Sequence, residues 1–87
     1  MGANRVRKTL DFENTLKQGD ECVARWTNSG YCHEGRVRVV RVNEKSIRVE
    51  LLNPQHGYPK GQELVLPRFW DFRRWSENNR LVPEGGL

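Results

Sequence analysis

Apolar and polar residues alternate along much of the chain between residues 20 and 83, and a period of two is that of a β-strand. Two further short apolar runs are each followed by a proline, which ends a strand because it offers no N–H group for pairing. Gly- and Asn-containing turns separate the runs. The pattern therefore predicts five short strands. They span residues 22–26, 33–42, 47–51, 63–66 and 80–82.

The second predicted strand has a break in its alternation. Val37 and Val39 share one face, but Val40 and Val42 take the apolar role after them. One extra residue near 39–40 restores the alternation, which indicates a β-bulge and a bent strand. Five short strands, one of them bent, are typical of a small all-β barrel closed on itself.

Strand alternation also predicts which side chains fill the barrel. We expect one barrel domain over residues 10–83, preceded by a flexible basic arm at 1–9 and followed by a frayed tail at 84–87. Between the arm and the first strand, Leu10, Phe12 and Leu16 allow either a short helix that ends at Gly19 or an irregular lead-in that packs on the core, and we favour one turn of helix. The predicted core comprises Val23 or Ala24, together with Val37, Val39, Ile47, Val49, Leu51 and Val65.

Length and composition limit the classes of function. The chain has 87 residues, of which 36% are hydrophobic. A chain of this size buries roughly 64% of its surface on folding, which leaves no volume for a deep cavity. This disfavours a two-domain enzyme, a nucleotide-binding α/β domain and a transporter. The sequence has no run of 18 apolar residues and no signal-peptide pattern near its start, so we expect a cytoplasmic protein.

Basic residues outnumber acidic ones, 15 against 11, which gives a formal net charge of +4. Four arginines of the second and third strands point away from the predicted core. If Val42 pairs with Ile47, Arg41 lies opposite Arg48, and we expect Glu50 on the diagonal to relieve their repulsion. The face is either a solvated surface of mixed charge or a site for an anionic ligand. The four are Arg36, Arg38, Arg41 and Arg48.

The segment 68–75 is the densest aromatic stretch of the chain. Three of its aromatic residues recur at every third position, the spacing of a 3₁₀ turn, and we expect this ridge to plug the barrel before the last strand. Trp70 stands off the ridge, beside Arg73 and Arg74. Either all four aromatic side chains belong to the core, or Trp70 stacks on a ligand. The ridge consists of Phe69, Phe72 and Trp75.

A stretch near the start of the predicted barrel resembles a known family. The run Gly19-Asp20-Glu21-Cys22-Val23-Ala24-Arg25-Trp26, then Ser29-Gly30 and Gly35-Arg36-Val37, resembles the opening of Tudor domains and of the related KOW-type barrels. The match covers about residues 17–52. It implies an SH3-like barrel of five strands with a bent second strand.

The same resemblance implies a ligand-binding role for several aromatic residues. Tudor domains that bind methylated Lys or Arg hold the cation in an aromatic cage. The resemblance places Trp26 at one cage position and His33 near a second, with Tyr31 and Tyr58 in neighbouring loops. KOW-type relatives contact RNA or protein instead.

Motifs of catalysis and metal binding do not occur in the sequence. There is no phosphate-binding loop, nucleophile elbow or zinc-helix motif, so we expect no enzyme and no cofactor. Cys22, Cys32, His33 and His56 lack the spacing of a metal site, and we expect no metal. If Trp26 pairs with His33, the cysteines lie roughly 17 Å apart, too far for a disulfide, and we expect free thiols.

A second, fainter similarity is to the type II dihydrofolate reductases, short SH3-like barrels that form one active site from four chains. Their Val-Gln-Ile-Tyr segment falls near residues 63–66, which read Glu-Leu-Val-Leu and lack its polar and phenolic groups. NADPH binding would distinguish this alternative.

The sequence therefore favours a non-catalytic module that binds nucleic acid through an Arg-rich face with nearby aromatic residues. The alternative is a Tudor-like module or small subunit that binds a protein through Trp26, Tyr31 and the segment 69–75. The predicted binding residues are Trp26, Tyr31, His33, Arg36, Arg38, Arg41, Arg48, Tyr58, Trp70, Arg73 and Arg74.

Overall fold

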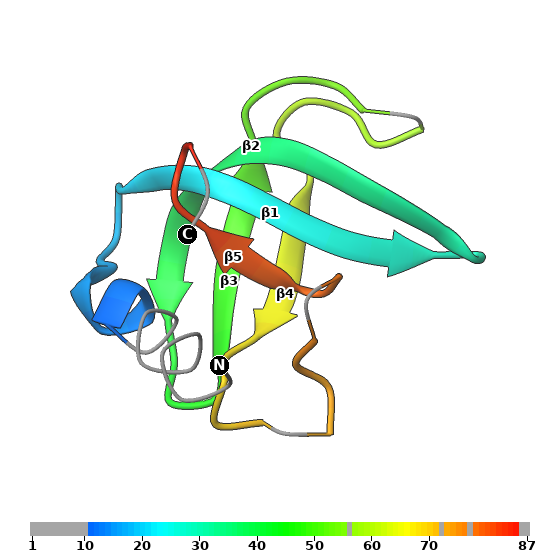
Figure 1. The fold of residues 1–87 in the computed structure, drawn as a ribbon. Helices are drawn as coiled ribbons and strands as arrows, with labels where there is room; N and C mark the ends of the chain where they lie inside the picture. Colours follow the sequence, from blue (N-terminus) through cyan, green and yellow to red (C-terminus); the bar gives the residue numbers. More distant parts are fainter. Residues whose placement is uncertain (1–10, 56, 72, 77, 86–87) are drawn as a thin grey trace.

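Five antiparallel strands form one curled sheet in the computed structural model (Figure 1). The structure describes residues 11–55, 57–71, 73–76 and 78–85. The sheet order is β4-β3-β2-β1-β5, so each strand pairs with its neighbour in sequence until β5 returns to pair with β1. This confirms the predicted small all-β barrel of SH3-like architecture. The strands are β1 (Glu21–Asn28), β2 (Tyr31–Val42), β3 (Ser46–Leu51), β4 (Glu63–Pro67) and β5 (Arg80–Val82).

The predicted bulge lies in β2. The pairing of β2 with β3 shifts between Val39 and Arg41, so Val40 is the extra residue. Beyond the bulge, Val42 lies opposite Ile47, as the sequence predicted. A bulge bends its strand and increases the local twist, and β2 is the long, curved strand that crosses Figure 1.

Alternate residues of the strands fill the core, and the prediction was wrong at one position. Val65 is 43% exposed, whereas Leu66 is buried. A run of three apolar residues allows either register, and pairing with β3 selects one, because Ile47 lies opposite Leu66 and Arg48 opposite Val65. On β1 it is Ala24, not Val23, that is fully buried. The buried apolar core comprises Cys22, Ala24, Trp26, Val37, Val39, Ile47, Val49, Leu51, Leu66, Leu81 and Val82.

A single helical turn at residues 11–15 precedes the sheet, as predicted. Phe12 and Leu16 are partly buried against the core. Glu13, between them, is buried at the same contact. The predicted basic arm at 1–9 lies outside the described residues, and so do the last two residues of the predicted tail.

The hairpin of β1 and β2 extends beyond the rest of the sheet (Figure 1). β5 pairs only with residues 23–25 of β1, so the remainder of β1 has β2 as its one neighbour among the described strands. Ser29 and Gly30 close the hairpin with φ values of 54° and 82°. Two successive positive φ angles are typical of a type I′ turn, whose twist matches that of the strands.

Candidate nucleic-acid interface

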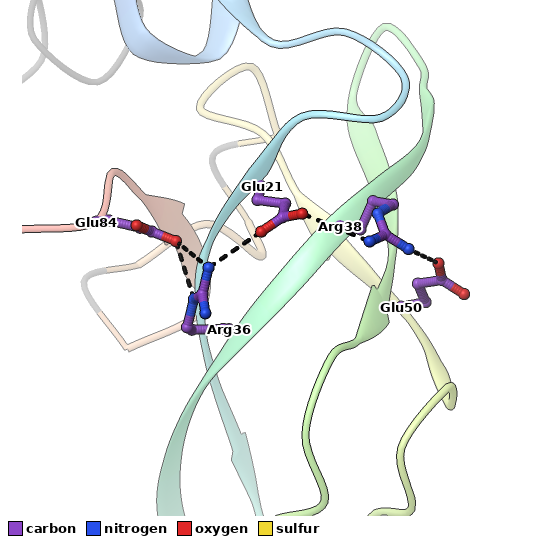
Figure 2. Close-up of polar contacts among 5 residues, drawn as sticks. All are labelled: Glu21, Arg36, Arg38, Glu50 and Glu84. Carbon is purple, nitrogen blue, oxygen red and sulfur yellow. Dashed lines mark hydrogen bonds and ion pairs between the residues drawn. The ribbon is translucent and has the colours of Figure 1, made fainter.

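The outer face of β2 carries a row of alternating charges, which we call the Arg ladder (Figure 2). Arg36 Nη2 lies 2.9 Å from Glu84 Oε1 and 3.0 Å from Glu21 Oε1. Arg38 Nη2 lies 3.5 Å from Glu21 Oε2, and its Nη1 lies 3.3 Å from Glu50 Oε1. Two arginines therefore lie between three glutamates, and Glu84 of the expected tail is one of the three.

Strand register explains the ladder and corrects one expectation. Glu50 lies directly opposite Arg38 and pairs with it, so it does not relieve the repulsion between Arg41 and Arg48. That role falls to Glu63 of β4, whose Oε1 lies 2.9 Å from Arg48 Nη1. The paired side chains are a third to a half exposed, where an ion pair stabilises the fold by about 0–1 kcal/mol.

Formal charges on the outer sheet face cancel. Arg25 is also paired there, with Glu34 at 2.8 Å. The face thus carries five arginines and five glutamates. A face without excess charge does not attract a polyanion from a distance. The excess of basic charge must therefore lie elsewhere. The ten residues are Arg25, Arg36, Arg38, Arg41 and Arg48, with Glu21, Glu34, Glu50, Glu63 and Glu84.

The predicted aromatic residues near the hairpin separate into a packed cluster and one exposed ring. His33 stacks on Trp26 with ring centroids 5.5 Å apart, and Tyr58 meets both rings edge-on at 5.4 Å. Asn28 Nδ2 donates a hydrogen bond to the Tyr58 hydroxyl. Trp26 is only 5% exposed and belongs to the core, whereas Tyr31 at the hairpin tip is 72% exposed. The structure therefore brings Trp26, His33 and Tyr58 of the four expected cage residues together, but the Trp26 ring is buried.

A second surface forms where the segment 68–75 meets the turn between β2 and β3. The backbone N–H of Arg68 donates to Lys45 O at 2.8 Å, and Arg68 Nη1 donates to Asn43 O at 2.9 Å. Both segments lie at the lower edge of Figure 1. We call this surface, formed by residues 43–45 and 68–75, the turn end of the barrel.

Two tight turns shape the segment 68–75. Asp71 N donates to Arg68 O at 2.8 Å, and Arg74 N donates to Asp71 O at 3.1 Å. These are the i to i+3 hydrogen bonds expected of the predicted turn before the last strand. Phe69 and Trp75 pack edge to face at 5.4 Å, as a ridge requires. The third ridge residue, Phe72, lies outside the described residues.

Trp70 lies on the surface of the turn end. It is 46% exposed, so the alternative that places all four aromatic side chains in the core does not hold for this residue. Its ring rests on the ring of Phe69, with centroids 6.1 Å apart and an interplanar angle of 67°. Arg73 and Arg74 follow it and are exposed. An exposed indole and two exposed arginines thus lie within five consecutive positions of the chain.

The turn end carries exposed cations together with the acids Glu44 and Asp71. In the part of the chain that the structure describes, Lys45, Arg73 and Arg74 form no ion pair. Arg41, two residues before Asn43, is also exposed and unpaired among these residues. Lys45 was not among the predicted binding residues, because only the folded chain brings it close to residue 68.

Metal binding and membrane crossing can be checked over the described residues 11–55, 57–71, 73–76 and 78–85. No group of three or more His, Cys, Asp or Glu side chains there could hold a metal ion. No helix in the same part of the chain has both the length and the apolar character needed to cross a membrane. The fold and these surfaces define a small all-β, SH3-like barrel. Comparisons with protein-family models, curated proteins and solved structures find no match, and the resemblance to Tudor and KOW-type barrels stays a prediction.

Proposed function

We propose that this protein is a non-catalytic module that binds nucleic acid at the turn end. The observation that carries the proposal is the exposed ring of Trp70, followed three and four residues later by the exposed Arg73 and Arg74. A base stacked on an aromatic side chain contributes about 1–3 kcal/mol of binding, and neighbouring cations contact the phosphates.

The distribution of charge supports the turn end over the Arg ladder. A phosphate that approaches Arg36 or Arg38 must compete with carboxylates already within 3.5 Å. At the turn end, which also contains Glu44 and Asp71, no carboxylate forms an ion pair with Lys45, Arg73 or Arg74 among the described residues. The proposal thus keeps the nucleic-acid ligand of the sequence analysis and moves its main contacts to another surface.

Fluorescence anisotropy with short single- and double-stranded DNA and RNA, at two salt concentrations, tests the proposal. Trp70→Ala should weaken binding by about 1–3 kcal/mol with little effect on the melting temperature. The double variant Arg73→Gln, Arg74→Gln should lower the salt slope by about 1 for each phosphate contact that is lost.

A matched control uses the Arg ladder. Arg36→Gln with Arg38→Gln removes the same charge from the balanced face, and we expect it to change affinity much less than the Arg73 and Arg74 pair. Neutral glutamine is preferred to a reversal to Glu, which would place five carboxylates in one row. If both double variants lose the same affinity for nucleic acid, the outer face of β2 also contacts the ligand and the turn end is not the main contact surface.

A protein ligand is the second candidate, and Tyr31 is the observation that favours it. A ring that is 72% exposed at the tip of a projecting hairpin is typical of a contact residue in protein interfaces. If nucleic acid does not bind, or if its affinity does not fall as the salt concentration rises, the protein ligand is favoured over the nucleic-acid ligand.

A further inference from the structure

Glu13 is a buried carboxylate that joins the helical turn 11–15 to the turn end. Its side chain is only 1% exposed. Both of its oxygens accept the backbone N–H of Phe69, at 3.3 Å for Oε1 and 3.1 Å for Oε2. Arg68 Nε lies 3.8 Å from Oε2, and Arg68 Nη2 donates to the neighbouring Asn14 Oδ1 at 3.0 Å. The helix thus holds two consecutive residues of the segment 68–75.

These contacts act on the residue that supports the Trp70 ring. Phe69 precedes Trp70 in the chain, and its ring is the one on which the indole rests. Arg68 is fixed from its other side by the turn between β2 and β3. Glu13 itself is buried beneath the surface, so it cannot touch a ligand that lies on Trp70.

We propose that Glu13 is a positioning residue for the Trp70 surface, whose charged carboxylate holds Arg68 and Phe69 in the arrangement that presents the indole ring to a base. The inference rests on the proposed nucleic-acid function and assigns the positioning of the Trp70 surface to the buried Glu13. Loss of the charge should therefore weaken binding although no ligand contact is removed.

The electrostatics of Glu13 separate this role from a purely structural one. Burial raises the pKa of Glu13 above its ordinary value of 4.5, against the hydrogen bond from Phe69 and the charges of Arg68 and Arg80. These two arginines are the charged groups that face it, from the segment 68–75 and from β5. A carboxyl with a raised pKa in the folded state favours folding most when protonated, and that contribution is lost as the pH rises through the folded pKa. The charged form at neutral pH is thus a cost to stability.

Substitution of Glu13 by an isosteric amide tests whether its charge lowers stability but supports binding. Glu13→Gln keeps an oxygen that can accept the N–H of Phe69 but removes the charge next to Arg68. We expect its melting temperature to equal or exceed that of the wild type, and its affinity for single-stranded nucleic acid to fall roughly tenfold, within the range lost with an aromatic–base stack.

Asp11→Asn is the matched control, because Asp11 is an exposed acid on the same helical turn. It removes the same negative charge and should leave binding unchanged or slightly stronger. Amide exchange at Phe69 gives a structural readout, and we expect it to be faster in Glu13→Gln than in Asp11→Asn.

The wild-type protein provides a second arm that needs no variant. Acidification protonates Glu13 and should weaken binding. In Glu13→Gln, the affinity for nucleic acid should not fall on acidification. If that variant does not fold, a wild-type affinity that stays level or rises in mild acid overturns the inference.

Failure of the inference and failure of the proposed function give different results. If the wild type binds and Trp70→Ala weakens binding, but folded Glu13→Gln binds as the wild type does, only the positioning role is wrong. If Trp70→Ala has no effect, or nucleic acid does not bind, the proposed function is wrong.

Discussion

Cys22 and Cys32 lie on the same hairpin but in opposite environments. Cys22 is fully buried on β1, and burial, with smaller effects from Asp20 and Glu84, raises the pKa of its thiol to about 12. Cys32 is exposed near the hairpin tip. Cys32 lies opposite Thr27 and Cys22 opposite Val37, so the two are five positions apart along the paired strands, as the sequence predicted.

This difference predicts selective thiol chemistry. The thiolate is the reactive form of cysteine, so an alkylating reagent should modify Cys32 in the folded protein and leave Cys22 unmodified. Mass spectrometry of the folded protein should show one adduct, and denaturant should expose the second. Cys32→Ser should take up no reagent while folded. Two rapid adducts in the folded wild type would contradict the buried position of Cys22.

At the scale of elements, local pattern predicted most of the strands and the bulge of β2, because both depend on neighbours in sequence. It failed at β4, where Leu64, Val65 and Leu66 are all apolar and period alone cannot choose a face. The pairing with β3 chooses, and it places Val65 beside Arg48 on the outer face. The register is thus a property of two strands, not of one.

Two alanine substitutions in β4 test that register. Leu66→Ala should lower the free energy of unfolding by about 2–5 kcal/mol, because it removes buried methyl groups and leaves a cavity. Val65→Ala, at a position 43% exposed, should change it by about 0.5–1 kcal/mol at most. Urea denaturation measures both. A larger effect at Val65 would restore the register that the sequence favoured.

At the scale of the whole molecule, charge is organised in a way that no local pattern could show. The sequence correctly placed the arginines of β2 and β3 outside the core, but their glutamate partners come from three other segments as well. The turn end likewise joins residues from two distant parts of the chain. Both surfaces depend on long-range pairing, so the sequence could not show which charged side chains pair with one another or which segments meet at the turn end.

The position of β5 bears on how the chain reaches this structure. The pairings β1–β2, β2–β3 and β3–β4 each join strands that are consecutive in sequence. β5 instead pairs with β1, the first strand, and no strand pairing joins it to β4 among the described residues. Contacts between near neighbours form early, and closing a long loop is slow. We therefore expect a four-strand intermediate in folding, to which the C-terminal segment docks last. In native-state hydrogen exchange, the amides of Arg80–Val82 should then open at a lower free energy than those of β3, and equal protection of the two strands would show that the barrel forms in one step.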